Sequence, residues 1–600
     1  MTVELPPEII LSCLAHLPVA DEATLPTLLA VSEASSAFLA LARSNVLWRP
    51  IAHALYHTHR PPSPEVLKQA EQEDGDNDGA FHRYVQFRAL KNWRARAIVH
   101  QIQEPRHRLP LIQELREALG VDVVERLQPA TFTEMNHPDD WLSLRYWASE
   151  LRKTLLRMEA VMTWDSVVKR DEQGAEADDD FEQGSNAFAA FRGLDPMLLP
   201  AQRYSTLINP TFLESLQDPP ARGTPQLEWL ANKVTQYMRE IHLRAARDGS
   251  FHDLDGHYVE LVWREADTDP TAGTLPMTLV SIFCSLVRRL PLARSLGISA
   301  KPVGFPGTVL ASLTYVTTGE RVFVNVFSNG TIMSMDTLRT MLRAMGQTPS
   351  EEFFRPATAR EMCLRVARNI LTSVRHGERR HGQPISHEDA TSALYSAAHA
   401  FFLLTDHSDA DGDQFATYCD WLVSLCQSEF PLDVSFLEKR VVPLLSPRRR
   451  DAIEALCEAV REEDRTEKEK KWVNADIKWK IGTVFHHRLF NYVAVIRGWD
   501  YKCEASEQWI RQMQVDRLPF GRNQPFYHVI VEDGSSRYVA SENITIPPAG
   551  PDGNNLCDEA VPALLEDESI GRYFKRRERN ENGRWVFVPS REVEAEYPDS

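Results

Sequence analysis

Residues 274–313 read TLPMTLVSIFCSLVRRLPLARSLGISAKPVGFPGTVLASL, and this stretch decides the fold expected for the middle of the chain. Pro276 suits a helix start, because its missing N–H would have no partner in the first turn. The apolar residues after it predict a helix that ends near Leu296. A Gly-Phe-Pro-Gly turn then leads into two strand candidates, TVLASLTYV at 308–316 and RVFVNVF at 321–327. The middle therefore combines helices with strands.

The composition is that of a multidomain globular protein. The chain has 600 residues, of which 43% are hydrophobic and 25% charged, and a chain of this length favours roughly three to five domains. Its formal net charge of −18 argues against a protein built around nonspecific nucleic-acid binding, which needs a concentrated positive field.

The cysteines, the sequence motifs and the apolar runs indicate the protein's cellular location and its need for metals or cofactors. Its eight cysteines show no CxxC pair and no zinc-finger spacing, which predicts reduced thiols and no metal. The chain has no P-loop and no dinucleotide-binding glycine motif, so no cofactor is expected. No apolar run approaches the length of a membrane span, and the first residues lack the basic start of a signal peptide. We expect a cytoplasmic or nuclear location.

Changes in composition divide the chain into six segments. Acidic, glycine-bearing stretches at 71–79 and 171–184 are typical of solvated loops. Apolar residues at three- and four-residue spacing predict helices in 81–170 and 385–460, and alternation after Trp472 predicts antiparallel strands. The expected fold class is multidomain α+β. Its segments are an N-terminal helical unit (1–50), a helical linker region with acidic loops (51–184), a mixed domain (185–375), a helical segment (376–471), a β domain (472–550) and a C-terminal tail (551–600). The mixed domain contains a further strand candidate at 257–265.

The mixed domain resembles the SirB-type branch of the transglutaminase-like superfamily. The residues that carry the resemblance are Pro276, Leu296-Gly297, Val303 with the following GFPG, and RPATAREMCLRVARNI at 355–370. A thiol hydrolase of that superfamily needs a cysteine at the helix N-terminus, a histidine base and an orienting acid. The resemblance places these three roles at Met277, Thr308 and Asn325, which cannot perform them. We expect a domain that keeps the fold and lacks the catalytic triad.

A rearranged catalytic pair is the alternative. Cys284 lies about two turns into the predicted helix, and His252 and His257 stand upstream in FHDLDGHYVE. Pairing Cys284 with either histidine would give a thiol hydrolase. However, a buried cysteine in the middle of a helix is more often an apolar core residue than a nucleophile, and the histidines are expected in a loop.

The first fifty residues predict three short helices, which are too few to bury a strong core by themselves. The segment resembles the F-box, with its opening LPxE, its central Val-Ser and its terminal tryptophan. The resemblance implies docking onto the Skp-type adaptor of a cullin–RING ubiquitin ligase. The adaptor-binding residues that it implies are Leu5, Pro6, Glu8, Ile9, Leu14, Leu17, Leu28, Val31 and Trp48.

The β domain resembles the YccV/HspQ family, often called the hemimethylated-DNA-binding domain. Matching positions are Gly482, Val484, His487, Tyr492, Gly498, Trp499, Gln524, Pro525, Tyr527, Val531, Tyr538, Val539 and Asn543. The resemblance implies a small, strongly curved antiparallel β-barrel. Basic and acidic side chains are roughly balanced over 478–543, which disfavours DNA binding. Bacterial members are tied to protein turnover, which favours protein binding instead. Candidate client-binding residues are Arg497, Trp499, Arg511, Arg517, Arg522 and Tyr527, although Trp499 and Tyr527 are each more often core residues.

Taken together, these resemblances favour a substrate-recognition subunit of a Skp–cullin–F-box ubiquitin ligase that has no catalytic activity of its own. The F-box would bind the adaptor, while the mixed domain and the β domain would bind a client protein. Two alternatives stay open: a thiol hydrolase that uses Cys284, and a DNA-binding module in the β domain.

Overall fold

The computed structural model describes residues 6–17, 24–34, 36–56, 80–196, 198–246, 252–269, 273–377, 384–405, 413–547 and 556–599. The chain divides into two compact units, each made of two stretches. Unit 1 comprises Met1–Arg88 and Leu155–Leu456, and unit 2 comprises Ala89–Thr154 and Cys457–Ser600. Helices that run across these boundaries are α6 (Ala80–Gln101), α8 (Trp141–Glu172) and α21 (Pro447–Arg465). None of the helices in the described ranges has the length and apolar character needed to span a membrane.

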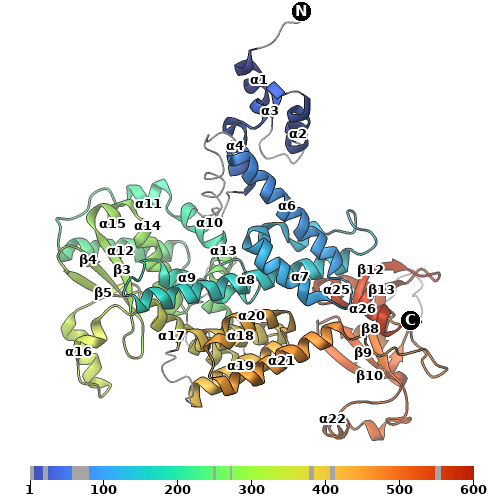
Figure 1. Ribbon diagram of the computed structural model, residues 1–600. Coiled ribbons are helices and arrows are strands. Elements are labelled where there is room, and N and C mark those ends of the chain that lie inside the picture. The colour runs from blue at the N-terminus through green and yellow to red at the C-terminus, as the bar shows by residue number, and fades with distance from the viewer. Residues whose placement is uncertain are drawn as a thin grey trace, which may run out of the picture. The chain divides into compact units, whose positions relative to one another are not determined.

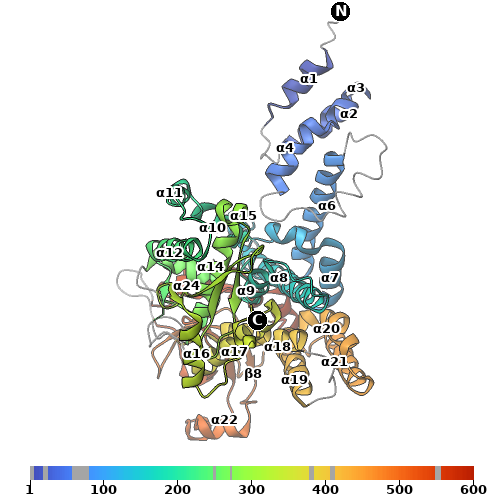
Figure 2. The same ribbon diagram turned by 90° about the vertical axis from the view of Figure 1, so that its left-hand side faces the viewer.

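The first helices of unit 1 share a small core. Helices α1 to α4 lie beside one another in both views (Figures 1 and 2). Trp48 is fully buried among Leu28, Leu47 and Ile51, and Tyr84 from the start of α6 joins this core. The start of α6 therefore adds buried apolar surface that three short helices lack. The bounds are α1 (Pro7–Leu14), α2 (Thr24–Ala34), α3 (Ser36–Ala42) and α4 (Asn45–Tyr56).

The middle of unit 1 is built on one buried helix and one sheet. Helix α14 (Pro276–Arg289) has every side chain from Met277 to Val287 buried, as expected of a helix that is apolar all round. It packs against the edge strand β3 of an antiparallel sheet in the order β3-β4-β5-β6. The helix start at Pro276 and the two strand candidates after it are confirmed. The strands are β3 (Ile298–Val303), β4 (Leu310–Tyr315), β5 (Arg321–Asn325) and β6 (Thr331–Met333).

Two local expectations for this domain were wrong. The strand candidate at 257–265 is helix α13 (Val259–Thr268), because its apolar side chains recur at helical spacing and are buried together. The helix expected to continue to Leu296 stops at Arg289, and a second helix, α15 (Pro291–Leu296), follows. The break falls at Pro291, because proline cannot donate the hydrogen bond that would continue a helix.

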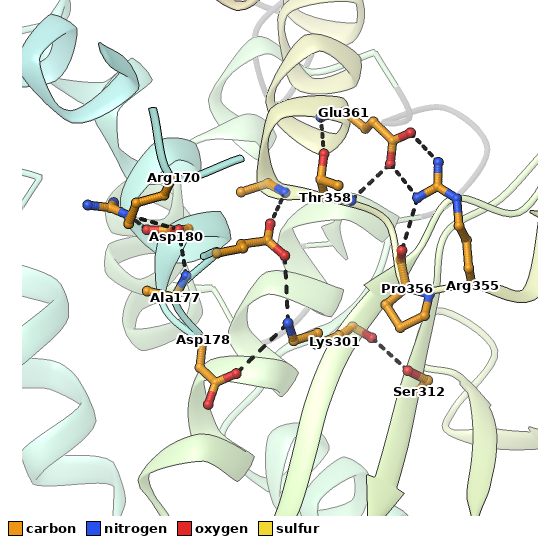
Figure 3. Close-up of polar contacts among 12 residues, drawn as sticks. Arg170, Ala177, Asp178, Asp180, Lys301, Ser312, Arg355, Pro356, Thr358 and Glu361 are labelled. Carbon is orange, nitrogen blue, oxygen red and sulfur yellow. Dashed lines mark hydrogen bonds and ion pairs between the residues drawn. The ribbon is translucent and has the colours of Figure 1, made fainter. Parts of the chain in front are cut away.

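The acidic stretch 171–184 also differs from expectation. It is a loop only over 173–179, because 171–172 end α8 and 180–184 begin α9 (Asp180–Ala190). Asp180 is fully buried and pairs with Arg170 of α8 (Figure 3). Glu182 pairs with Arg289 of α14 at 2.7 Å. Each carboxylate has an arginine partner, which offsets its loss of hydration. The other acidic stretch, 71–79, lies outside the described residues.

A polar network fixes the start of α17 (Ala359–His376). Thr358 and Glu361 form a capping box, in which each side chain accepts from the other residue's backbone N–H. Arg355 donates to both carboxylate oxygens of Glu361 (Figure 3). Glu176 accepts from the N–H of Ala359 and lies 3.6 Å from the ammonium group of Lys301 on β3. The acidic stretch therefore joins the helix start to the sheet.

The other elements of unit 1 are mostly helical, and they confirm the helices expected in 385–460. Helix α17 packs against α18, and α18 packs against α19. These elements are α10 (Leu198–Leu207), α11 (Pro210–Glu214), α12 (Thr224–Glu240), α16 (Met335–Ala344), α18 (His387–Leu404), α19 (Asp413–Ser428), α20 (Val434–Arg440), and the short strands β1 (Arg244–Ala245) and β2 (Gly273–Thr274).

Unit 2 contains an antiparallel sheet in the strand order β10-β9-β8-β7-β11. No pairing between β10 and β11 closes it within the described ranges, so the closed barrel expected from the sequence is not found. The strands are β7 (Val484–His487), β8 (Val493–Asp500), β9 (Phe526–Val531), β10 (Ser536–Ala540) and β11 (Ile544–Thr545), and α22 (Glu507–Gln512) lies on the loop between β8 and β9.

The tail expected at 551–600 is part of the core of unit 2. Its strands β12 (Phe574–Arg579) and β13 (Trp585–Pro589) pair antiparallel, and Phe574 and Phe587 are buried with Val484 and Trp499 of the sheet. The tail therefore packs with the β domain and does not extend freely into solvent. The remaining elements of unit 2 are α7 (Arg108–Glu114), α23 (Leu556–Glu559), α24 (Val561–Glu566), α25 (Ile570–Tyr573) and α26 (Arg591–Glu596).

Candidate functional site

A cavity of about 150 Å³ lies at the N-terminus of α14. Met277 and Thr308, two of the three positions expected to have lost catalytic residues, both line it. The third, Asn325, does not line it, and its side-chain oxygen accepts from the N–H of Ser328 at 3.0 Å. Two of these positions therefore share one cleft. The side chain of Asn325 instead forms a hydrogen bond within the turn that follows it.

The cleft contains a hydroxyl–imidazole pair that sequence reasoning missed. Nε2 of His257 lies 2.9 Å from Oγ of Ser373, and both residues are buried. Burial lowers the pKa of His257 to about 3, so the imidazole is neutral at physiological pH. His252, which also lines the cleft, stacks on His376. No cysteine lines this cavity, so the described residues offer hydrogen bonds there and no thiol nucleophile.

Cys284 lies elsewhere on α14. It lines a separate, much smaller crevice together with Ser281 and Ser285. Burial raises the pKa of the Cys284 thiol to about 12. A catalytic thiol needs the opposite environment, in which nearby positive charge lowers the pKa. Within the described part of the chain, no three metal-binding side chains gather to form a metal site.

Thiol labelling checks this environment. At neutral pH, the thiolate fraction of Cys284 is expected to be roughly three orders of magnitude below that of an ordinary thiol. Iodoacetamide should therefore modify the exposed Cys13 first, and the fast reaction should disappear in Cys13→Ser. A fast reaction that survives this substitution and maps to Cys284 by mass spectrometry would contradict the inert environment.

The predicted adaptor-binding residues divide by burial. Leu28 and Trp48 are core residues, and the indole N–H of Trp48 donates to the carbonyl of Ala42. Ile9 is 47% exposed on α1 and Val46 is 61% exposed on α4; sequence reasoning missed Val46. The other predicted residues are exposed (Pro6, Glu8), partly buried (Leu14, Leu17, Val31) or outside the described residues (Leu5).

The predicted client-binding residues also divide. Trp499 and Tyr527 are fully buried in the core of unit 2, and the hydroxyl of Tyr527 accepts from the N–H of Lys478 at 3.2 Å. Arg522 pairs with Asp516 at 2.7 Å and also with Glu507. The two arginines left on the open surface are Arg511 and Arg517.

Arg497, the sixth predicted residue, lines a cavity of about 650 Å³ beside β10. Apolar residues from two loops face this cavity: Leu489 and Phe490 from the turn between β7 and β8, and Trp509 and Met513 from the loop that carries α22. Sequence reasoning missed these four residues, because they come from separate loops that only the fold brings together. At this volume, and with apolar walls, the cavity has the size and lining typical of a ligand-binding pocket.

Comparison with protein-family models matches two parts of the chain. Residues 245–368 match the family described as "Transglutaminase-like superfamily". Residues 477–581 match the family described as "Hemimethylated DNA-binding protein YccV like". The chain carries a transglutaminase-like core and a YccV-like domain. The first match includes most residues of the cleft at α14, although Ser373 lies beyond its end, and the second contains the cavity beside β10.

Curated relatives connect the chain to one protein. It is 25% identical to "F-box only protein 21" of Pongo abelii over 332 residues, which cover 52% of this chain and 47% of the relative. The proteins of the same name from Mus musculus and Homo sapiens are 26% identical over 328 residues, 52% of this chain and 48% of each relative. The chain is thus distantly homologous to F-box only protein 21, and it spans about half the length of the curated relatives it matches. No solved structure matches significantly.

The YccV-like match agrees with the packing of unit 2. It extends to residue 581 and so includes β12, which the sequence analysis assigned to a separate tail. A bridge between Thr483 and Val586 joins the start of the sheet to β13. Both the match and the packing therefore extend beyond the predicted boundary at 550.

Proposed function

We propose that the protein is a substrate-recognition subunit of a Skp–cullin–F-box ubiquitin ligase. The homology to F-box only protein 21 supports this function. The observation that carries it is the exposure of Ile9 and Val46 on two helices of the N-terminal unit. Exposed apolar side chains on a small helical unit favour a partner that covers them. A cytoplasmic or nuclear location belongs to the same proposal.

In this proposal the chain does no chemistry of its own. The cleft at α14 presents a neutral His257 and no cysteine, which supports a transglutaminase-like core that acts as a scaffold. Its contribution to ubiquitin transfer is proximity, because holding a client lysine near the charged conjugating enzyme raises their effective concentration. The client binds to the transglutaminase-like core and to the YccV-like domain.

Binding to a purified Skp-type adaptor tests the proposal. The full-length chain should bind the adaptor in isothermal titration calorimetry. Ile9→Asp and Val46→Asp should each weaken binding at least about 30-fold, because each places an unpaired carboxylate in an apolar interface at roughly 2 kcal/mol or more. Leu14 and Leu17 are poorer choices, because both pack partly against the core of their own unit.

The matched control is Met135→Asp. Met135 is 91% exposed in unit 2. Its substitution therefore adds the same charge at an exposed apolar position outside the F-box-like helices. It should leave adaptor binding unchanged. If the intact chain does not bind the adaptor, or if Met135→Asp weakens binding as much as Ile9→Asp, the proposal is wrong.

A further inference from the structure

We propose that the cavity beside β10 binds a client segment as an extended strand that adds to the free edge of β10. The segment carries an apolar side chain next to a carboxylate. This inference deepens the proposed function, on which it rests for calling the segment a client. It assigns the client site to an edge strand and two flanking loops, which differs from the set of arginines expected from the sequence.

The register of the sheet identifies which backbone groups face outward. The N–H of Val531 donates to the carbonyl of Ser535 in the turn between β9 and β10. Hydrogen-bonded pairs alternate along an antiparallel ladder, and the register pairs Ser536 with Ile530 and Tyr538 with His528. Counting from the turn, Ser536 and Tyr538 occupy the non-hydrogen-bonded positions. Their backbone N–H and carbonyl groups therefore point away from β9.

No described strand pairs with that edge. β10 pairs with β9 alone, and neither Ser536 nor Tyr538 makes a backbone hydrogen bond to another described segment. Ser536 is exposed and Tyr538 is half-buried. An open edge of this kind accepts an extended peptide through main-chain hydrogen bonds, while neighbouring pockets select its side chains. The free edge thus explains how a segment would bind to β10.

The cavity of about 650 Å³ supplies the side-chain pockets. β10 forms one wall, the loop with α22 contributes Trp509, Met513 and Leu518, and the turn after β7 contributes Leu489 and Phe490. Leu489 and Phe490 are 62% and 65% exposed, and Met513 is also exposed. α22 lies at the end of the β9–β10 sheet in both views (Figures 1 and 2), where Ile510 is buried with Phe526 of β9 and Ala540 of β10. The apolar walls favour an aromatic or aliphatic side chain.

The charges around the cavity select a carboxylate. No aspartate or glutamate lines it, whereas Arg497 and Arg537 both do. Arg537 already pairs with Asp533 at 3.2 Å, so Arg497 is the cation on which the selection depends. Nε of Arg497 is buried without a hydrogen-bond partner, and its guanidinium lies over the ring of Tyr573, 4.5 Å from the centroid. No described carboxylate forms an ion pair with Arg497, so a carboxylate of the bound segment would satisfy its charge.

Asp500, a buried acid that bonds to two of the cavity's residues, does not compete for this role. Asp500 accepts hydrogen bonds from Lys471 at 2.5 Å, His528 at 3.0 Å and Tyr538 at 2.6 Å. These donors hold the pKa of Asp500 well below its usual range despite burial. Its negative charge is therefore already compensated, and it repels an incoming carboxylate only weakly. The same bonds hold Tyr538 of β10 in place beside the cavity.

Peptide binding to the full-length chain tests the inference. The probe is a short fluorescein-labelled peptide of alternating glutamate and valine around one central phenylalanine, followed by fluorescence anisotropy. A second peptide replaces each glutamate with lysine, and a third carries N-methyl groups on alternate backbone nitrogens. The acidic peptide should bind at least about tenfold more tightly than either of the others, because each lacks one of the two interactions inferred above.

The variant Ser536→Pro tests the edge directly. By the register, proline at this position removes an outward N–H and leaves the β9–β10 ladder intact. It should weaken binding of the acidic peptide about tenfold or more, and Ser536→Ala should bind as the unchanged chain does. If Ser536→Pro proves unfolded by circular dichroism, the N-methylated peptide tests the same hydrogen bonds on the unaltered chain.

Three outcomes overturn the inference: no binding of the acidic peptide, equal binding of the acidic and N-methylated peptides, or displacement of the acidic peptide by duplex DNA. Adaptor binding is measured on the same samples. Loss of peptide binding with adaptor binding intact removes the inference alone. Peptide binding without adaptor binding removes the ligase proposal and leaves the peptide site in place.

Discussion

Gly482→Ala is expected to unfold the YccV-like domain. Gly482 has a φ of +80°, a conformation that strains any residue with a Cβ. An added Cβ would also lie 1.7 Å from the carbonyl oxygen of Phe587. Because that oxygen belongs to the backbone of β13, the strand would have to move away from β7. We expect a loss of more than about 4 kcal/mol, in the range reserved for changes that break a core contact.

Hydrogen exchange resolves this effect by segment. In Gly482→Ala, the amides of β8 and β9 should lose their protection, while those of α14 in unit 1 keep it. Gly583→Ala is the matched control, because Gly583 also has a positive φ, of +74°, and nothing lies within 4 Å of its added Cβ. That variant should lose only about 1 kcal/mol from strain. Unchanged protection of β8 and β9 in Gly482→Ala would show that β13 is not packed against β7.

This contact marks a limit of the sequence prediction. Gly482 was recognised as a position shared with the YccV/HspQ family, and the alternating pattern after Trp472 predicted the strands. However, the partner of Gly482 is Phe587, whose N–H donates to the Gly482 carbonyl at 2.9 Å. Pairing between segments about a hundred residues apart leaves no periodic signal in either one. The sequence therefore suggested a tail where the structure has two further strands.

In the middle of the chain, the local sequence pattern was sufficient to predict most helices and strands. The apolar run after Pro276 and the strand candidates from Thr308 onward were predicted, because period and turn residues agree there. The run at 257–265 misled, because its short apolar pattern fits strand and helix equally well. Burial on one face of a helix settles such cases, and burial depends on neighbours from other parts of the chain.

The candidate sites show the same division. The resemblance predicted that Met277 and Thr308 belong to one site, and both line one cleft. This was possible because both flank elements that the sequence already indicated. It did not find Ser373, which lies 116 positions from its partner His257. It also did not find the loops around the cavity beside β10, whose apolar side chains carry no motif. Side chains that line a site from several loops become recognisable only when the backbone has placed them.

Asp433→Ala is expected to destabilise unit 1 by about 3–5 kcal/mol. Nε of Arg157 on α8 donates to Asp433 at 2.7 Å, and a second bond of 3.3 Å joins Nη2 to the other carboxylate oxygen. The two side chains are 5% and 3% exposed. Removing the carboxylate takes its negative charge and both hydrogen bonds away from a buried guanidinium, and breaking a buried ion pair by removing one partner is strongly destabilising.

A double substitution distinguishes the contribution of the ion pair from the cost of leaving one of its charges behind. Arg157→Met with Asp433→Leu removes both charges and should recover most of the stability that Asp433→Ala loses, because apolar pairs of similar volume often replace buried ion pairs without loss. Protection of the α18 and α20 amides measures each variant. Protection in Asp433→Ala equal to that of the unchanged chain would mean that water reaches Arg157. Recovery in the double variant would instead mean that α8 and α20 are held together by packing, and that the ion pair chiefly fixes their register.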